Sequence, residues 1–165
     1  MHTSNKTTAF EEIGNILEEY AAKGVFQGFN RGAVSGNKAA FRIVWHYNQV
    51  FDLSYDHGKS ALRLHTVLPQ LPATSPMYRD LKRFLKSSCD TALPAHRRID
   101  PARATVKPYN RAGNVALTLK MLDGDSEYGV RKLIHLVHEI YLEFLSDGRY
   151  FDWLVETFEL DPDNP

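Results

Sequence analysis

Three short segments between residues 41 and 68 alternate apolar and polar side chains, and they limit the possible folds more than any other feature of the chain. A period of two is typical of a half-buried β-strand. The links between the segments are short and polar and leave no room for a crossover helix, so we expect an antiparallel meander. The second link, Asp56-His57-Gly58-Lys59, is expected to turn with Gly58 at a positive φ. The apolar side of the meander is predicted to hold Phe41, Ile43, Trp45, Phe51, Leu53, Tyr55, Leu62, Leu64, Thr66 and Leu68.

The chain before the meander is predicted to open with an amphipathic helix. Apolar residues recur at helical spacing from Phe10 to Tyr20, with glutamates on the opposite side. Thr8 and Glu11 have the spacing of a capping box, and Gly24 is expected to end the helix. Residues 25–38 contain regularly spaced glycines and are consistent with either a loop or a weak first strand.

The chain after the meander is predicted to form a helix, two strands and two further helices. Ser75 is expected to be the N-cap of the first of these helices, because Pro76 is well tolerated as the first helical residue. Pro108 places the next strand at a sheet edge or ends it. The other predicted elements are strands over residues 103–107 and 115–121 and helices over residues 127–145 and 151–158.

This order of elements indicates an α+β fold. We expect an antiparallel sheet of about five strands with helices packed on one face, in the order α-β-β-β-α-β-β-α-α. The chain has 165 residues, the size of one ordinary domain, and 43% of them are hydrophobic. A single domain over residues 1–165 is therefore predicted, with flexible tails at residues 1–8 and 160–165. The lone cysteine, Cys89, cannot form an intramolecular disulfide.

The overall charge argues against two classes of partner. The formal net charge is +0 and the pI about 7.1, whereas proteins dedicated to nucleic acids or membrane surfaces usually carry a basic excess. The first residues lack the apolar stretch of a signal peptide, and no apolar run reaches the ~20 residues of a membrane span. We therefore expect a cytoplasmic protein whose partner is a protein, rather than a nucleic acid or a membrane.

Two segments resemble metal-binding motifs, and each has a simpler explanation. His135, His138 and Glu139 lie on the long predicted helix, but the histidines are three residues apart and the glutamate follows them, unlike metalloprotease motifs. A polar stripe, or a histidine and a glutamate paired at the helix surface, explains them without a metal. The segment from Asp123 to Glu127 resembles part of a calcium loop, yet a turn followed by a helix N-cap explains it fully. We therefore predict no metal and no other cofactor.

Catalysis has little support in the sequence. Cys89 could be a nucleophile beside a histidine, but its place at the end of an amphipathic helix favours a small buried side chain. The chain contains no Walker loop, dinucleotide fingerprint or nucleophile elbow. We therefore predict no catalytic residues, and a metal-dependent enzyme centred on residues 135–139 is the alternative of this class.

The centre of the chain is basic, whereas the part after Glu139 is acidic. One interpretation is that the basic segment, residues 96–111, binds phosphates while Tyr109 stacks on a base, as in a nucleic-acid-associated regulator. The other is that the two segments neutralise each other within the fold or across a dimer, or are simply solvated. The cations of the nucleic-acid alternative are Arg97, Arg98, Arg103, Lys107 and Arg111.

The predicted order of elements resembles that of the type III secretion chaperone-like fold, which includes the YbjN-type bacterial proteins. The resemblance rests on the meander over residues 41–68, the helix that follows Ser75, and the hairpin over residues 103–121 that leads into the long helix. It implies a small, often dimeric protein that holds extended segments of a partner and has no catalytic residues to transfer. Secretion chaperones are markedly acidic and this chain is neutral, so the YbjN-type comparison fits better.

The leading hypothesis is a non-enzymatic protein-binding module, chaperone-like or regulatory, that forms a homodimer. Sheet edges and exposed aromatic side chains are the expected contacts, because both favour capture of a peptide by strand addition. The aromatic residues predicted for this surface are Trp45, Tyr47, Tyr55, Tyr109, Tyr150 and Trp153.

Overall fold

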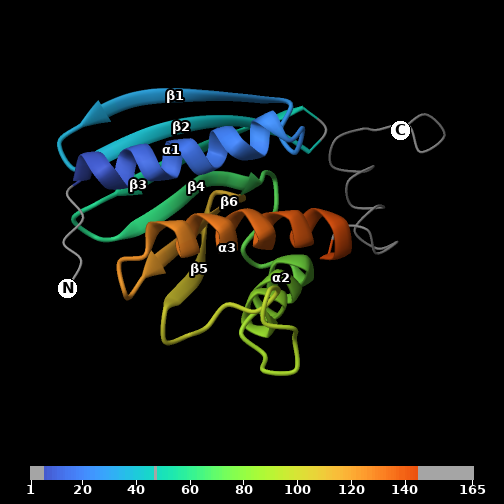
Figure 1. The fold of residues 1–165 in the computed structure, drawn as a ribbon. Helices are drawn as coiled ribbons and strands as arrows, with labels where there is room; N and C mark the ends of the chain where they lie inside the picture. The colour runs from blue at the N-terminus through green and yellow to red at the C-terminus, as the bar shows by residue number, and fades with distance from the viewer. Residues whose placement is uncertain (1–5, 47, 145–165) are drawn as a thin grey trace.

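The computed structural model describes residues 6–46 and 48–144 of the chain. Figure 1 shows a single sheet with helices lying across it. The elements, in chain order, are α1 (Lys6–Ala22), β1 (Gly28–Ser35), β2 (Lys38–Trp45), β3 (Gln49–Asp56), β4 (Ala61–Leu68), α2 (Pro76–Ser87), β5 (Ala104–Arg111), β6 (Asn114–Met121), α3 (Ser126–Glu139) and the π-helical turn η1 (Ile140–Phe144).

The strands form one antiparallel sheet in the spatial order β1-β2-β3-β4-β6-β5. The α+β class and the antiparallel meander are therefore confirmed, and the sheet has six strands rather than about five. The additional strand is β1, which the sequence could not separate from a loop because none of its residues is buried. A two-residue turn joins it to β2, and Gly36 in that turn has a φ of +59°, which glycine adopts without strain.

The helices gather on one side of the sheet. In Figure 1, α1 and α3 lie side by side across the strands, and α2 lies beyond α3, near β5. The inward positions of β2 and β3 are buried in strict alternation, as the sequence predicts. Leu17 of α1, Leu64 of β4 and Leu133 of α3 belong to one hydrophobic core, so the sheet and the helices share a single interior. The opposite side of the sheet is left with polar and exposed positions.

Gly24 ends α1 as predicted, in a Schellman motif. Its N–H donates to the Ala21 carbonyl at 3.0 Å, and the N–H of Val25 donates to the Tyr20 carbonyl at 2.9 Å. The φ of Gly24 is +80°, a left-handed conformation that few other residues adopt cheaply.

The starts of the first two helices differ in how well the sequence predicts them. Ser75 caps α2 as expected, because its hydroxyl accepts a hydrogen bond from the Tyr78 N–H at 3.1 Å. The capping box expected at Thr8 is wrong, since α1 begins at Lys6 and Thr8 lies inside the helix. Residues 6–8 therefore belong to α1 and not to a tail.

Two predictions fail where the backbone departs from regular geometry. The register between β4 and β6 shifts between Leu64 and Leu68, so Thr66 is exposed and Val67 takes the buried place. In the turn before β4, the positive φ falls on Ser60, at 49°, instead of on Gly58. Neither departure can be foreseen from alternation alone.

The second half of the fold follows the sequence prediction closely. β5 is an edge strand as expected, but it continues through Pro108, because the outer side of an edge strand needs no hydrogen bonds. Asp125 caps α3 by accepting from the Tyr128 N–H, which confirms the turn and N-cap explanation of the acidic segment before it. The long helix predicted over residues 127–145 is α3 followed by η1. The closing helix predicted over residues 151–158 and the tail at residues 160–165 lie outside the described residues. No helix of the described chain has the length and apolar character that crossing a membrane requires.

Candidate binding surfaces

The side of the sheet away from the core, which we call the open face, is a broad polar surface. One row of side chains runs across five paired strands, from Ala40 through Ser54, Arg63 and Thr118 to Lys107. Strands lie ~4.8 Å apart, so this row extends about 20 Å. The open face comprises Lys38, Ala40, Arg42, Val44, Val50, Asp52, Ser54, Asp56, Arg63, His65, Thr105, Lys107, Tyr109, Arg111, Thr118 and Lys120.

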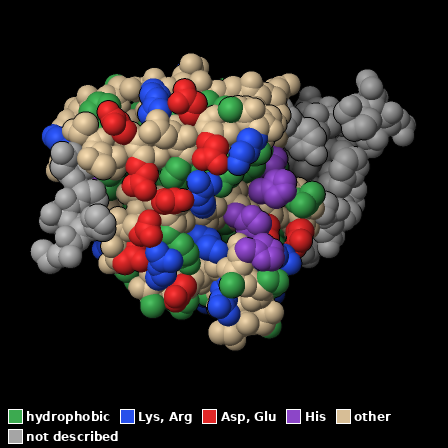
Figure 2. Space-filling model, in the orientation of Figure 1, with side chains coloured by type: hydrophobic (Ala, Val, Ile, Leu, Met, Phe, Trp, Pro, Cys, Tyr) green, Lys and Arg blue, Asp and Glu red, His purple; other side chains and the backbone are tan. Residues whose placement is uncertain are grey.

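The open face is cationic although the whole chain is neutral. One of its two carboxylates, Asp52, is already paired, with Arg42 Nε 3.0 Å from its Oδ1. The helix side differs: Figure 2, viewed from that side, shows acidic and basic side chains interspersed over α1 and α3. The two sides of the sheet therefore differ: cations outnumber acids on the open face, whereas both signs are mixed on the helix side. The charged residues of the open face are the cations Lys38, Arg42, Arg63, Lys107, Arg111 and Lys120 and the acids Asp52 and Asp56.

Tyr109 is the exposed large aromatic side chain of the described chain, at 53% exposure, and it lies on this face. The guanidinium carbon of Arg63 is 5.4 Å from the centre of its ring, a cation–π contact. His65 nearby shares a 3.0 Å hydrogen bond with Ser54. Burial lowers the pKa of His65, and the positive charges of Arg63 and Lys38 lower it further while Asp52 opposes them. Burial is therefore the main cause of the lowered pKa of His65, and the nearby charges add a smaller effect.

The outer edge of β1 is a second candidate surface. Within the described chain no strand pairs with this edge, and β1 contains no buried residue over its eight positions. The pairing with β2 is irregular between Arg31 and Val34. Gly32 lies within this irregularity, where a Cβ would come within 3.0 Å of the Ala40 carbonyl oxygen. The edge is thus long and accessible, with one bulge.

A depression of about 380 Å³ lies between β1 and the first turns of α1. Phe10, Phe41 and Val34 supply apolar parts of its lining, and Val34 is 63% exposed. Arg31 also lines it and ties β1 to the helix, because its guanidinium lies 2.9 Å from Asn15 Oδ1. A side chain projecting from a strand added to β1 could enter this depression.

The opposite edge of the sheet, β5, is less suited to pairing. Pro108 interrupts its row of N–H donors, and Lys107 and Arg111 place charges along it. Proline and charged residues on an edge strand are devices that prevent edge-to-edge association. The β1 edge has a bulge between Arg31 and Val34 but no proline, so the two edges differ in degree in their ability to accept another strand.

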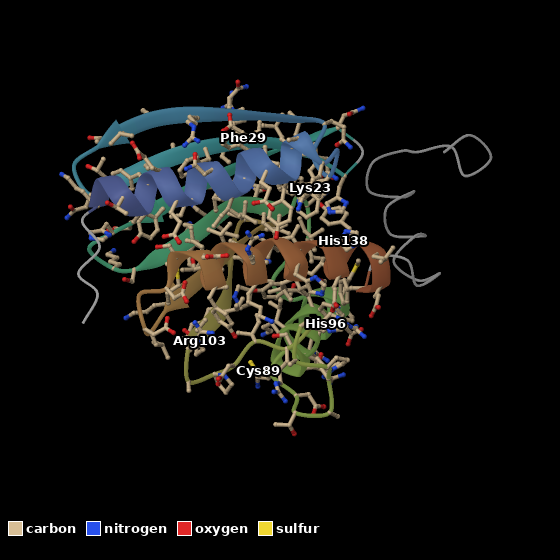
Figure 3. The ribbon with its side chains drawn as sticks, viewed as in Figure 1. Lys23, Phe29, Cys89, His96, Arg103 and His138 are labelled. Atoms are coloured by element: carbon tan, nitrogen blue, oxygen red, sulfur yellow. The ribbon has the colours of Figure 1, made fainter. Side chains whose placement is uncertain are left out.

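The histidines predicted as metal ligands lie at the C-terminal half of α3, where Figure 2 shows purple side chains gathered and Figure 3 labels His96 and His138. His135 Nε2 and Glu139 Oε1 are 3.0 Å apart, which confirms the histidine–glutamate pair. Glu139 Oε1 also accepts a 2.7 Å hydrogen bond from Arg97. The described residues contain no group of three or more His, Cys, Asp or Glu side chains placed to hold a metal ion.

The carboxylate of Glu139 therefore has a structural role, because it is hydrogen-bonded to Arg97 and His135. Burial acts to raise its pKa, but the hydrogen bond and charge of Arg97, with His135, outweigh burial and hold the pKa below its ordinary value. Arg97 also pairs with Glu143, at 3.2 Å. This network fastens the segment before β5 to α3 and η1.

His46 lies in an aromatic stack at the end of β2. Its ring centre is 4.0 Å from that of Trp45 and 4.3 Å from that of Tyr141, and His138 is 6.0 Å away. Its Nε2 is buried and has no hydrogen-bond partner among the described residues. Burial, with a smaller effect of charge on His138, lowers the pKa of His46 to about 4. The ring is therefore neutral near pH 7 and serves packing rather than acid–base chemistry.

The basic segment 96–111 does not form one surface. Arg97 faces Glu139, and Arg103 lies 2.7 Å from both Asp123 and Asp125. Figure 3 shows Arg103 on this helix side. Neutralisation between the basic segment and the acidic part of the chain describes Arg97, whereas the partners of Arg103 lie outside that acidic part. Arg98 donates to the Thr91 carbonyl at 3.3 Å. Of the five predicted cations, Lys107 and Arg111 alone belong to the open face.

A depression of about 440 Å³ beside α3 also contains cations, but they already have partners. Arg131 pairs with Glu127 at 3.2 Å, and Lys132 donates to the carbonyls of Ala95 and His96. Arg103 stacks on Tyr128, with 3.8 Å between its guanidinium carbon and the ring centre. These charges stabilise the fold and leave little positive potential for a ligand.

The aromatic surface predicted from the sequence is not assembled. Trp45 and Tyr55 are 5% and 2% exposed and belong to the core, so that part of the prediction is wrong. Tyr109 is exposed on the open face. The remaining predicted residues, Tyr47, Tyr150 and Trp153, lie outside the described residues.

Cys89 is half-buried after α2, and its Sγ is 4.0 Å from the Ser88 hydroxyl. Figure 3 shows it well apart from His138.

Sequence reasoning missed Arg42, Arg63 and Lys120 as candidate residues, because they lie on separate strands. The alternation within each strand predicts that these three residues point away from the core, and this pattern could have identified them.

Comparisons with protein-family models, with curated proteins and with solved structures gave no match to this chain.

Proposed function

We propose that this chain is a non-enzymatic protein-binding module that captures an extended segment of a partner protein along the outer edge of β1. The observation that carries the proposal is an eight-residue edge strand that has no buried residue and no second strand partner in the described chain. Such an edge presents N–H and C=O groups to which an added strand can hydrogen-bond.

The depression beside β1 supports a preference for particular segments. In strand addition, main-chain hydrogen bonds supply affinity and pockets for alternate side chains supply selectivity. Phe10, Val34 and Phe41 line this depression, so an apolar side chain of the captured segment suits it. The contrast with β5, where Pro108 and two cations guard the edge, favours β1 as the site.

The order of elements predicted from the sequence resembles the type III secretion chaperone-like fold, although the structure has one more strand, β1, before α2. That resemblance favours the same function, because the fold implies proteins that hold extended segments. A chaperone-like or regulatory role in the cytoplasm is part of the proposal. A homodimer is part of it too, and pairing of the β1 edges of two copies is one way to form it. The two uses of the edge compete, so dimer formation and capture of a partner should exclude each other.

The proposal is tested with peptides selected from a random library on the full chain. We expect them to share an apolar residue and to bind through their main chain. Methylation of alternate amide nitrogens in a selected peptide should abolish binding, whereas methylation of the intervening amides should be tolerated, because every second N–H of a strand faces its neighbour.

Val34→Lys should weaken the selected peptides at least tenfold, since it places a charge at the depression. Val50→Lys is the matched control, because Val50 is an exposed strand valine at 54% on β3. Equal effects of both variants, or binding that amide methylation does not disturb, would contradict strand addition at β1.

A further inference from the structure

We infer that the open face is a second binding surface, distinct from the β1 edge, and that its ligand is a single-stranded nucleic acid. Six cations and two carboxylates share this side of the sheet, and one of the carboxylates is paired with Arg42. The excess of positive charge is complementary to a phosphate backbone. The formal net charge of +0 hides this excess, because residues 145–165 hold six acidic residues and one arginine.

The cations are distributed so that an extended strand can meet several of them. Arg63 and Lys107 both flank Thr118, one on each neighbouring strand, so they lie about 10 Å apart across the sheet. Lys120 is two residues along β6 from Thr118, a step of about 7 Å. A polymer that crosses β4, β6 and β5 therefore finds a positive side chain on each strand.

Tyr109 distinguishes a nucleic acid from other polyanions. It lies between Lys107 and Arg111 on β5, and Arg63 reaches its ring from across the sheet. An exposed ring amid cations offers a stacking surface for a base whose phosphates bind nearby. An acidic peptide would meet the charges but would leave the ring without a comparable partner.

The shape of the surface favours single strands over duplexes. A side chain such as Tyr109 can stack on a base only when that base is unstacked from its neighbours, as in single-stranded nucleic acid. The open face is formed by paired strands of one sheet, and the described helices lie on the other side, so this face presents no helix to a major groove. The ligand class is thus set jointly by charge, by the exposed ring and by the sheet.

The inference is tested by fluorescence anisotropy with the full chain and a labelled single strand of about 12 nucleotides, as DNA and as RNA. We expect micromolar binding at about 50 mM salt, with log K falling against log salt at a slope of about −3 for four phosphate contacts. Arg63→Glu combined with Lys120→Glu should weaken binding at least tenfold and roughly halve the slope.

The matched control changes the net charge equally on another element. Arg79 and Lys86 are exposed on α2, and Arg79→Glu combined with Lys86→Glu should alter binding less than twofold. Tyr109→Ala should weaken binding at least fivefold, and Tyr109→Phe should retain it, because the ring and not the hydroxyl stacks. Thermal unfolding monitored by circular dichroism verifies that each variant folds, and Lys107→Glu with Arg111→Glu replaces the first pair if that pair does not.

Several results would overturn the inference. They are absence of binding at low salt, an equal loss in the α2 control, or binding of duplex DNA, polyglutamate or anionic lipid vesicles as tightly as the single strand. Val34→Lys serves as a cross-check, because it should leave nucleic-acid binding unchanged. Failure of the β1 proposal and failure of this one are therefore distinguishable.

Discussion

At the scale of single residues, His46 is held where its charged form is disfavoured. The ring is stacked between Trp45 and Tyr141, its buried Nε2 lacks an acceptor among the described residues, and the ionisable group facing it from α3 is His138. Adding a proton to His46 would therefore place an unpaired charge against a like charge. The pKa of about 4 expresses this cost.

The consequence is a stability that falls with acid. The folded-state pKa of His46 lies below its ordinary value of 6.5, so between these values the unfolded chain binds more protons. The contribution is fully present above about pH 6.5 and is lost as the pH falls toward 4. We expect a loss on the order of 1–2 kcal/mol, allowing for solvent that reaches the ring. His46→Asn, which tolerates the φ of 44°, should reduce this pH dependence in urea unfolding at pH 7.5 and 4.5.

The exposed residue His96 supplies the control, since His96→Asn should keep the wild-type pH dependence. If His46→Asn unfolds with the same pH dependence as the wild type, the neutral stacked histidine is not the source of the acid sensitivity. Carboxylates such as Glu139 add their own loss at lower pH and are common to all three proteins.

Residue type alone does not show which aromatic side chains are free to bind. Trp45 and Tyr55 look suited to an interface, but each continues an alternation that includes Phe41 or Phe51, and the core takes them. Tyr109 falls on the outward phase of β5 and stays exposed. The position of a residue in the alternation of its strand, which can be read from the sequence, therefore predicts burial better than its aromatic character does.

At the scale of elements, β1 shows how an exposed strand depends on its backbone. No side chain of β1 is fully buried, and the strand is held by its hydrogen bonds to β2, by partly buried Phe29 stacked on Phe41, and by Arg31, which reaches α1. The irregular pairing near Gly32 brings the two strands close together. Because β1 makes few packing contacts with the core, little stabilisation is available to offset the cost of a local clash.

Gly32→Ala should therefore destabilise the protein by about 1–2 kcal/mol, because its Cβ would lie 3.0 Å from the rigid Ala40 carbonyl oxygen. Gly58→Ala is the comparison, since its Cβ would meet atoms at 3.4 Å and the φ of Gly58 is not positive. It should be neutral or slightly stabilising, because alanine restricts the unfolded chain. Urea unfolding of the two variants decides the matter, and an equal cost for both would show that Gly32 is not closely packed.

Elements were predictable from the sequence where burial leaves a pattern. β2, β3 and the start of α2 at Ser75 follow from alternation and capping chemistry. β1 could not be predicted in this way, because a strand with no buried face displays no alternation of apolar and polar residues. The exposure of Thr66 depends on a register shift between β4 and β6, which is a long-range property. The open face could not be predicted without knowing which strands pair, since its cations come from β2, β4, β5 and β6.

At the scale of the whole molecule, stability is distributed unevenly across the sheet. The core is shared by α1, α3 and the four inner strands. The central pair, β3 and β4, contributes buried residues such as Phe51 and Leu62. β1 is paired on one side in the described chain and contributes to the core only the partly buried Phe29. Local opening should therefore begin at β1 and should not require the core to open.

Hydrogen exchange measured by mass spectrometry tests this order directly. In dilute protein the amides of β1 should exchange at least tenfold faster than those of β3 and β4. Local fraying is enough to expose the amides of β1, whereas exchange in β3 and β4 requires a larger part of the fold to open. A selected peptide should slow exchange in β1 specifically, since an added strand hydrogen-bonds its outer edge. A second copy on the same edge would instead make protection of β1 rise with protein concentration. Protection of β1 equal to that of β3 at every concentration would mean that its edge is already covered, and capture of a partner there would be ruled out.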